Sequence, residues 1–446
     1  MYPFIIIVML LVPASALGSE DQSSPEEVLT LEQAVALALE SNRLVKNAGL
    51  EVSKQEDSLM VARTRRLPIF DVKVFGSILL QPIDFTFKQG DFGTFPGGGP
   101  NPATDVQITT PRQFNTFAFI SVDQPLSQLY RINLGIQSAK VSSQLAGEEL
   151  RLQRQSIAGQ VKAAYFTVLQ TQSALEAVEQ SIKLYHELDR VTGDYVLQKV
   201  ALKSQGLEVK ERLAKAQYES LKLHNAIRSQ KERLNQLLGR PISTDFVVSP
   251  MPQMTVFEMD LAAAQARARE QRPELREAQL KRKQAELDRR SKKAEFIPDI
   301  SLSYRYLSPF SVDVLPKNIS AAGLYLSWEP FDWGRKRREL ATKRTAEQQA
   351  SNAAEETESQ VLLDVNTRFR KLQETREALH VNQLGQETER EKLLVLSNRY
   401  TAKAALLSDV LQSEANLAQA NHEYREALAS FWTAKAEFER ALGEER

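Results

Sequence analysis

Residues 70–77 read Phe-Asp-Val-Lys-Val-Phe-Gly-Ser, and residues 299–306 read Asp-Ile-Ser-Leu-Ser-Tyr-Arg-Tyr. In both stretches apolar and polar side chains alternate, which is the pattern of a β-strand with one apolar face. Residues 324–328 alternate in the same way, whereas residues 114–122 have apolar side chains on both faces, so their orientation stays open. The sequence therefore predicts four strands, over residues 69–80, 114–124, 299–308 and 318–329.

The rest of the chain has the composition of long helices, with Ala, Leu, Gln, Glu, Lys and Arg dominating. No proline occurs between Pro125 and Pro241, and none follows Pro330. Apolar residues recur there every three or four positions, as in paired helices. These features predict two coiled-coil-like helical hairpins, over residues 126–239 and 331–442.

The two halves of the chain match each other. Residues 36–68 align with residues 266–298, and Leu238-Gly239 aligns with Leu442-Gly443. Each half thus consists of a helix, a strand, a loop, a strand and a helical hairpin. The domain prediction is a first repeat over 17–240 with a long loop at 81–113, a linker over 241–260 and a second repeat over 261–446.

The return helix of each predicted hairpin is much shorter than the outgoing helix. We expect the preceding helices, over residues 27–66 and 261–295, to extend the return helices by stacking end to end with them. Helices that end near residues 200 and 404 would fit this arrangement.

The first residues are typical of a secretory signal peptide, residues 1–16. An apolar run from Phe4 to Val12 precedes the small residues Ala14-Ser15-Ala16. The run is too short to cross a bilayer as a helix, which takes about 20 residues. No basic residue precedes Arg43, unlike most signal peptides, and a buried N-terminal segment is the alternative.

Composition excludes several classes of function. The 57 basic and 57 acidic residues give a formal net charge of zero, which argues against a nucleic-acid partner. The chain has no cysteine, and its four histidines are too widely spaced to form a metal-binding pair on one helix. No nucleophile, base and acid group together in the sequence. We therefore expect no enzyme, no cofactor and no metal site.

Four strands cannot close a barrel, and an open sheet edge in lipid leaves backbone groups without hydrogen bonds. Two copies would give eight strands, and three would give twelve with room for water inside. The inward side chains would be polar and the outward ones apolar. The alternative is a soluble β-sandwich with a helical stalk. The expected inward residues are Asp71, Lys73, Ser301, Ser303 and Arg305.

The chain resembles the TolC-like outer-membrane efflux proteins over nearly its whole mature length. The resemblance rests on the stretches 30–34 (Thr-Leu-Glu-Gln-Ala), 272–275 (Arg-Pro-Glu-Leu), 330–334 (Pro-Phe-Asp-Trp-Gly) and 408–411 (Ser-Asp-Val-Leu), and on the duplicated order of strands and hairpins. It implies a mostly helical trimer with a twelve-stranded transmembrane β-barrel in the outer membrane and a helical tunnel in the periplasm.

The resemblance also implies a function. Such a trimer acts as a passive exit duct, working with a periplasmic adaptor (membrane fusion protein) and an inner-membrane transporter in efflux or in type I secretion. The alternative from another class is a periplasmic coiled-coil structural or adaptor protein of the cell envelope.

Site residues carried over from the family lie at the hairpin tips and beside the strands. Lys199 and Lys403 stand where the family has a turn glycine, and Ala405 stands where it has an arginine. The expected periplasmic entrance constriction is Asp409, Tyr400, Gln412 and Gln205. The expected adaptor-contacting tip is Lys199, Val200, Ala201, Leu202, Lys403, Ala404, Ala405 and Leu406.

Aromatic and basic residues next to the strands are expected to anchor the chain in outer-membrane lipid. Core packing of the tryptophans and salt bridges within charged helix ends are the alternatives. Another basic cluster, Arg289, Arg290, Lys292 and Lys293, precedes the third predicted strand. The expected interface anchors are Trp328, Trp333, Arg335, Lys336, Arg337 and Arg338.

Overall fold

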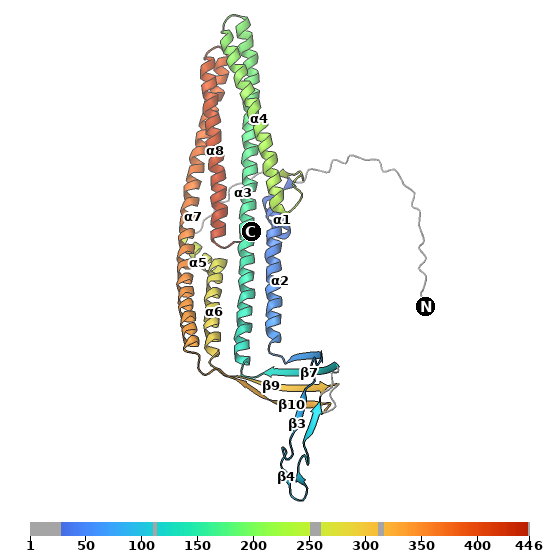
Figure 1. Cartoon of the computed structure of the whole chain (residues 1–446). Coiled ribbons are helices and arrows are strands. Elements are labelled where there is room, and N and C mark those ends of the chain that lie inside the picture. The colour runs from blue at the N-terminus through green and yellow to red at the C-terminus, as the bar shows by residue number, and fades with distance from the viewer. Residues whose placement is uncertain (1–27, 110–113, 250–259, 311–315, 445–446) are drawn as a thin grey trace, which may run out of the picture.

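The computed structural model describes residues 28–109, 114–249, 260–310 and 316–444. The predicted signal peptide, residues 1–16, lies outside these ranges, as do parts of the predicted loop and linker. The described chain is a long helical body with a small β-sheet at one end and the turns that connect paired helices at the other (Figure 1).

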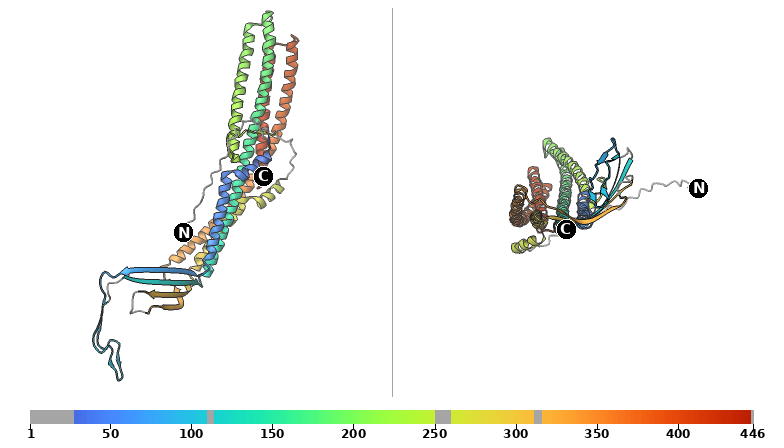
Figure 2. Two further views of the ribbon diagram at one scale, coloured as in Figure 1. Left: turned by 90° about the vertical axis from the view of Figure 1, so that its right-hand side faces the viewer. Right: turned by 60° about the horizontal axis from the view of Figure 1, so that its bottom comes forward.

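Two antiparallel helical hairpins form most of the body. Helix α3 (Leu129–Leu197) returns as α4 (Lys203–Leu238), and α7 (Arg335–Thr401) returns as α8 (Leu407–Ala441). The 69 residues of α3 span about 100 Å at ~1.5 Å per residue. The two hairpins lie side by side with their turns at the same end of the body, which we call the tip, and α3 and α4 reach slightly farther than α7 and α8 (Figure 2).

The helix that precedes the first strand of each repeat is broken into two, contrary to the prediction of single helices over 27–66 and 261–295. The pieces are α1 (Leu31–Ser41), α2 (Arg43–Thr64), α5 (Leu261–Gln271) and α6 (Pro273–Ala294). Asn42 has an extended backbone, and its side chain caps α2 by accepting from the Leu44 N–H. Arg272 is extended because it precedes Pro273, which disfavours helical geometry.

At each break the return helix of the hairpin meets the short helices end to end, as expected. The Asn42 side-chain amide donates to the Leu237 carbonyl at 2.8 Å. Gly239, with φ of 73°, ends α4 so close to α1 that a Cβ there would lie 2.5 Å from the Ser41 carbonyl oxygen. Gly443 approaches Gln271 in the same manner in the second repeat.

Four antiparallel strands form the main sheet, in the order β10-β9-β7-β2. Strands β2 and β10 are therefore its two edges. The strand bounds are β2 (Ile69–Ile78), β7 (Phe114–Pro125), β9 (Asp299–Pro309) and β10 (Ile319–Ser327).

The segment 81–113, expected to be a loop, contains further strand pairs among its described residues. Strand β3 (Asp84–Phe87) pairs with β6 (Val106–Thr109), and β4 (Thr94–Phe95) pairs with β5 (Gly99–Pro100). This arm projects beyond the main sheet, away from the helices (Figure 1). Strands β1 (Val28–Leu29) and β8 (Val247–Val248) form a separate parallel pair beside the helices.

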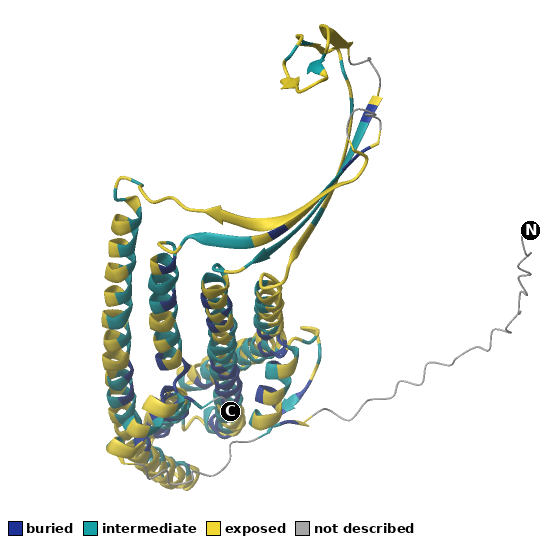
Figure 3. Cartoon of the chain, turned by 90° about the horizontal axis from the view of Figure 1, so that it is seen from below, coloured by how far each residue is buried: buried dark blue, intermediate teal, exposed yellow. Residues whose placement is uncertain are grey.

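The hydrophobic core lies between the helices. The buried residues lie where the helices face one another; the edge strands β2 and β10 are largely exposed, and β7 and β9 are mostly of intermediate exposure (Figure 3). In the largest cluster the Phe166 ring stacks on Trp432 with centroids 5.5 Å apart, which joins α3 to α8. Among the described residues, no helix is both long and apolar enough to cross a membrane.

Candidate functional site

The strand register places the polar residues nearest the helices on one face of the main sheet and mostly apolar residues on the other; farther from the helices the first face also carries Phe75, Phe117 and Phe119. Asp71 pairs with Ser121, and Ser121 pairs with Arg305, so all three share a face. Val72, Ile120 and Tyr306 form the neighbouring row on the opposite face. The residues expected to point inward (Asp71, Lys73, Ser301, Ser303 and Arg305) thus occupy one face, and the orientation of β7, which the sequence left open, follows from its pairing.

No other part of the described chain covers the apolar face. Phe70 is 72% exposed, Val72 67% and Leu324 72%. An apolar surface of this kind on both edge strands marks a region that contacts lipid or another chain. The polar face is linked across strands by a hydrogen bond from the Ser303 hydroxyl to Asp123.

The turns of both hairpins have the same backbone geometry. Lys199 and Lys403 have φ of 52° and 60°, the left-handed conformation that favours glycine. In each turn the next N–H bonds back to the last helical turn, from Val200 to Tyr195 O at 2.9 Å and from Ala404 to Arg399 O at 2.8 Å. The lysines therefore stand at true glycine-type positions.

Two of the predicted constriction residues act as helix caps. Gln205 accepts from the Leu202 N–H at 2.9 Å, and Asp409 accepts from the Leu406 N–H at 3.3 Å. Leu202 and Leu406 are 70% and 68% exposed, so both tips present an apolar side chain beside the capped turn.

Tyr400, also expected in the constriction, is buried inside the chain. Its hydroxyl lies 3.1 Å from Thr192 Oγ1, and its ring meets the Tyr195 ring edge-on with centroids 5.8 Å apart. The Lys403 ammonium lies 5.4 Å from the centroid of the same Tyr195 ring. In this conformation these side chains join the second hairpin to α3, and the Tyr400 hydroxyl faces a neighbouring helix. A place for Tyr400 in the constriction stays a prediction.

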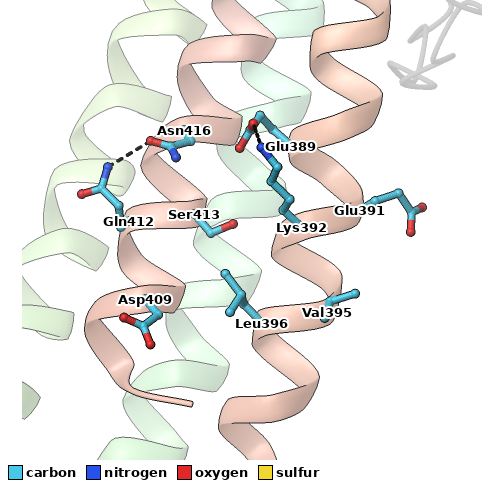
Figure 4. Close-up of a pocket in the computed structure, with 9 residues that line it drawn as sticks. All are labelled: Glu389, Glu391, Lys392, Val395, Leu396, Asp409, Gln412, Ser413 and Asn416. Atoms are coloured by element: carbon cyan, nitrogen blue, oxygen red, sulfur yellow. Dashed lines mark hydrogen bonds and ion pairs between the residues drawn. The ribbon is translucent and has the colours of Figure 1, made fainter. Parts of the chain in front are cut away.

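Asp409 and Gln412 lie together in a groove of about 500 Å³ between α7 and α8 (Figure 4). Lys392 pairs with Glu389 at 2.6 Å on the α7 side of the groove, and Gln412 donates to Asn416 at 2.9 Å on the α8 side. Gln205 lies at the other hairpin, so one chain does not gather all four predicted constriction residues at one point.

A buried polar contact below the tip was not anticipated from the sequence. The Tyr185 hydroxyl on α3 donates to the Glu414 carboxylate on α8, and both residues are buried. Burial is the largest cause that raises the pKa of Tyr185, and the hydrogen bond to Glu414 is the second. The sequence signal is slight: Glu414 occurs among apolar residues such as Val410 and Leu411, which face the same cluster.

The predicted interface anchors lie where β10 passes into α7. Trp328 is 58% exposed and Trp333 is 91% exposed, so neither packs in a core in the single chain. Arg335 and Lys336 both pair with Glu329, at 2.7 and 3.2 Å. Within the described part of the chain, Arg337 and Arg338 form no ion pair. The salt-bridge alternative therefore holds for two of the four cations.

Comparison with known proteins identifies the class. The chain belongs to the outer membrane efflux protein family, whose model matches residues 34–240 and 264–444. A search of curated protein sequences gives no significant match.

Solved channel structures have the same fold at low identity. The outer-membrane channel OprN is 18% identical, with 93% of this chain and 89% of that chain covered and a TM-score of 0.76. VceC from Vibrio cholerae is 17% identical (93% and 96% covered, TM-score 0.73). The CmeC outer membrane channel of Campylobacter jejuni is 13% identical (97% and 93% covered, TM-score 0.77).

The predicted class of function is thereby confirmed. The protein is an outer-membrane channel with a large periplasmic tunnel, and it serves as a passive exit duct of a tripartite efflux system. The family works as trimers with an adaptor and an inner-membrane transporter, and its members are channels, not enzymes.

Proposed function

We propose that the trimer closes its β-barrel at a seam between strand β2 of one subunit and β10 of the next. The unpaired edges of the four-stranded sheet carry this proposal. Neighbouring strands alternate in direction from β2 to β10, so an antiparallel seam continues the same pattern into the next subunit. The apolar face then meets lipid and the polar face lines the water-filled path.

The entrance lies at the opposite end, at the hairpin tips. Three copies of Asp409 form a ring of carboxylates around the axis, which attracts cations. The exposed tip residues, including Val200, Leu202 and Leu406, contact the adaptor. The exposed Trp333 and the unpaired Arg337 and Arg338 anchor the chain at the lipid headgroups.

Disulfide trapping tests the seam, because the chain has no native cysteine. Cysteines at Val72 in β2 and at Leu324 or Ala322 in β10 are on the apolar face of the two edge strands. Mild oxidation of the membrane-inserted protein should give covalently linked dimers and trimers on denaturing gels.

The matched control pairs Val72→Cys with Leu221→Cys, which lies on α4 and is exposed but distant from any sheet edge. Cross-links in the control alone, or monomers with every β2–β10 pair, would contradict the seam. Pore conductance in planar bilayers then tests whether the closed assembly forms a water-filled path.

A further inference from the structure

A pocket of about 810 Å³ lies at the end of α6, where the chain enters the sheet. One side of it is basic, with Arg289, Arg290 and Lys293. The other side includes Phe296 and Ile297, which are 43% and 46% exposed. No acidic residue belongs to the lining. We call this site the basic pocket; its full lining is Tyr130, Arg289, Arg290, Lys293, Ala294, Phe296, Ile297 and Leu340.

The charges of the basic pocket are only partly neutralised. Arg289 pairs with Glu347 of α7 at 2.6 Å, and Arg290 lies 3.5 Å from Glu286 on its own helix. Lys293 has no acidic partner within ion-pair distance among the residues that the structure describes. The pocket thus holds surplus positive charge beside an apolar wall.

The face of α6 that carries these cations follows from its neighbours. Leu287 packs toward α3 in the cluster with Leu134, whereas Asp288 and Lys292 pair with Lys343 and Glu339 of α7. Successive residues of a helix are rotated by about 100° around its axis, so Asp288 and Lys292 lie about 100–140° from Leu287 around α6. The directions from α6 toward α3 and toward α7 are therefore separated by about this angle.

In a closed ring each helix contacts two neighbours, and the directions toward them divide the circumference of the helix into a smaller and a larger sector. The smaller sector faces the lumen, and the larger sector faces outward. Arg290 and Lys293 fall in the larger sector of α6, so they face away from the duct. Because α6 lies between α3 and α7 of the same chain, this outward face is also removed from the β2–β10 seam.

The basic pocket therefore opens outward at the level where the helices meet the apolar face of the sheet. We propose that it binds the phosphate headgroup of an anionic phospholipid from the periplasmic leaflet, with an acyl chain along Phe296 and Ile297. Arginine and lysine recognise phosphate by charge-assisted hydrogen bonds, and the apolar wall suits the adjoining chain. The inference rests on the proposed function, because it requires the sheet to lie in the membrane.

The first repeat provides an internal comparison. Helix α2 carries Leu59 and Met60 at the positions that align with Arg289 and Arg290. The repeat fold alone thus does not require two arginines at this junction. Their presence in only the second repeat fits a binding role in that repeat.

Native mass spectrometry of the detergent-purified trimer tests the proposal. The probes are phosphatidylglycerol, phosphatidylcholine with the same acyl chains, and inorganic phosphate. The test variant is Arg290→Gln/Lys293→Gln, which leaves the inter-helix pair of Arg289 in place. The matched control is Lys54→Gln/Lys281→Gln, which removes two cations that are paired within their own helices.

We expect the wild type to prefer phosphatidylglycerol to phosphatidylcholine. The test variant should lose affinity for phosphatidylglycerol by about 10- to 30-fold, as for two headgroup-contacting charges, while the control keeps it. Equal phosphatidylglycerol affinity of the two double variants, or equal affinity of the wild type for both lipids, would overturn the proposal. Inorganic phosphate bound as tightly as phosphatidylglycerol would assign the pocket to free phosphate instead.

Bilayer conductance separates this proposal from the proposed function. The test variant should conduct like the wild type, because Arg290 and Lys293 lie outside the lumen. A wild-type protein that forms no pore would contradict the proposed function whatever its lipid binding, whereas normal conductance without lipid selectivity would contradict only the basic pocket.

Discussion

The hydroxyl of Tyr400 lies 3.1 Å from Thr192 Oγ1, and this hydrogen bond joins the two helical hairpins near the tip. Thr192 is fully buried and Tyr400 nearly so, which excludes water as an easy substitute partner. The contact ties α7 to α3, so a widening of the tip that separates these two helices would have to break it.

Replacing Tyr400 with Phe should loosen the tip. The change removes one hydrogen bond and leaves the Thr192 hydroxyl buried without this partner, at a cost of about 1–2 kcal/mol. We expect a higher open probability in planar-bilayer recordings. The control is Tyr218→Phe, whose ring is 65% exposed. Equal open probability of wild type and Tyr400→Phe would show that this bond does not restrain the tip.

Replacing Lys199 with Gly should stabilise the first turn. Lys199 has a left-handed backbone, which costs a residue with a Cβ about 1 kcal/mol relative to glycine. Lys203→Gly is the matched control, because Lys203 begins α4 and a glycine there should not stabilise. Thermal unfolding of the two variants should therefore shift in different directions; a lower melting temperature for Lys199→Gly would contradict the strain argument.

Replacing Asp409 with Asn tests the proposed carboxylate ring. The amide keeps an oxygen that can cap α8 but removes three charges from the trimer. We expect a reduced preference for cations, measured as a reversal-potential shift in a salt gradient. Glu391→Gln, on the same groove but on α7, is the control. Unaltered ion selectivity in Asp409→Asn would place Asp409 off the conduction path.

Replacing Gly239 with Ala should destabilise the junction between α4 and α1. A Cβ would lie 2.5 Å from the Ser41 carbonyl oxygen, and φ of 73° adds backbone strain. The expected loss is about 2 kcal/mol or more in the free energy of unfolding. Gly385→Ala, in the middle of α7 with open space around the Cβ, should instead be neutral or slightly stabilising. Urea unfolding of both proteins measures the difference.

The buried Tyr185 should make stability fall in alkaline solution. Its pKa is raised by burial and by Glu414, so the unfolded chain loses the proton near pH 10 while the folded chain keeps it. The free energy of unfolding therefore decreases as pH rises above about 10. Tyr185→Phe should weaken this decrease, and Tyr218→Phe should not. Urea unfolding at about pH 8 and about pH 11 provides the comparison; identical slopes for Tyr185→Phe and wild type would contradict it.

The sequence alone determined the architecture, because the signals that specify it are local. Alternation at residues 70–77 and 299–306, and proline-free stretches after Pro125 and Pro330, depend only on which side chain follows which. The prolines and glycines that interrupt helices and strands recur in the same order in both halves, and this determined the order of strands and hairpins. The same local chemistry explains the break between α5 and α6, because Pro273 disfavours helical geometry at Arg272. No proline marks the corresponding break at Asn42.

Only the tertiary structure decided which residues meet. Strand β7 has apolar residues on both faces, and pairing with β2 and β9 was needed to show that Ile120 lies on the apolar face and Ser121 on the polar one. The partners of Tyr400 and Tyr185 lie more than two hundred positions away in the chain. Such contacts depend on the rotation and axial shift of long helices, which a three-to-four-residue periodicity leaves nearly free, and only packing of the two hairpins against each other sets them.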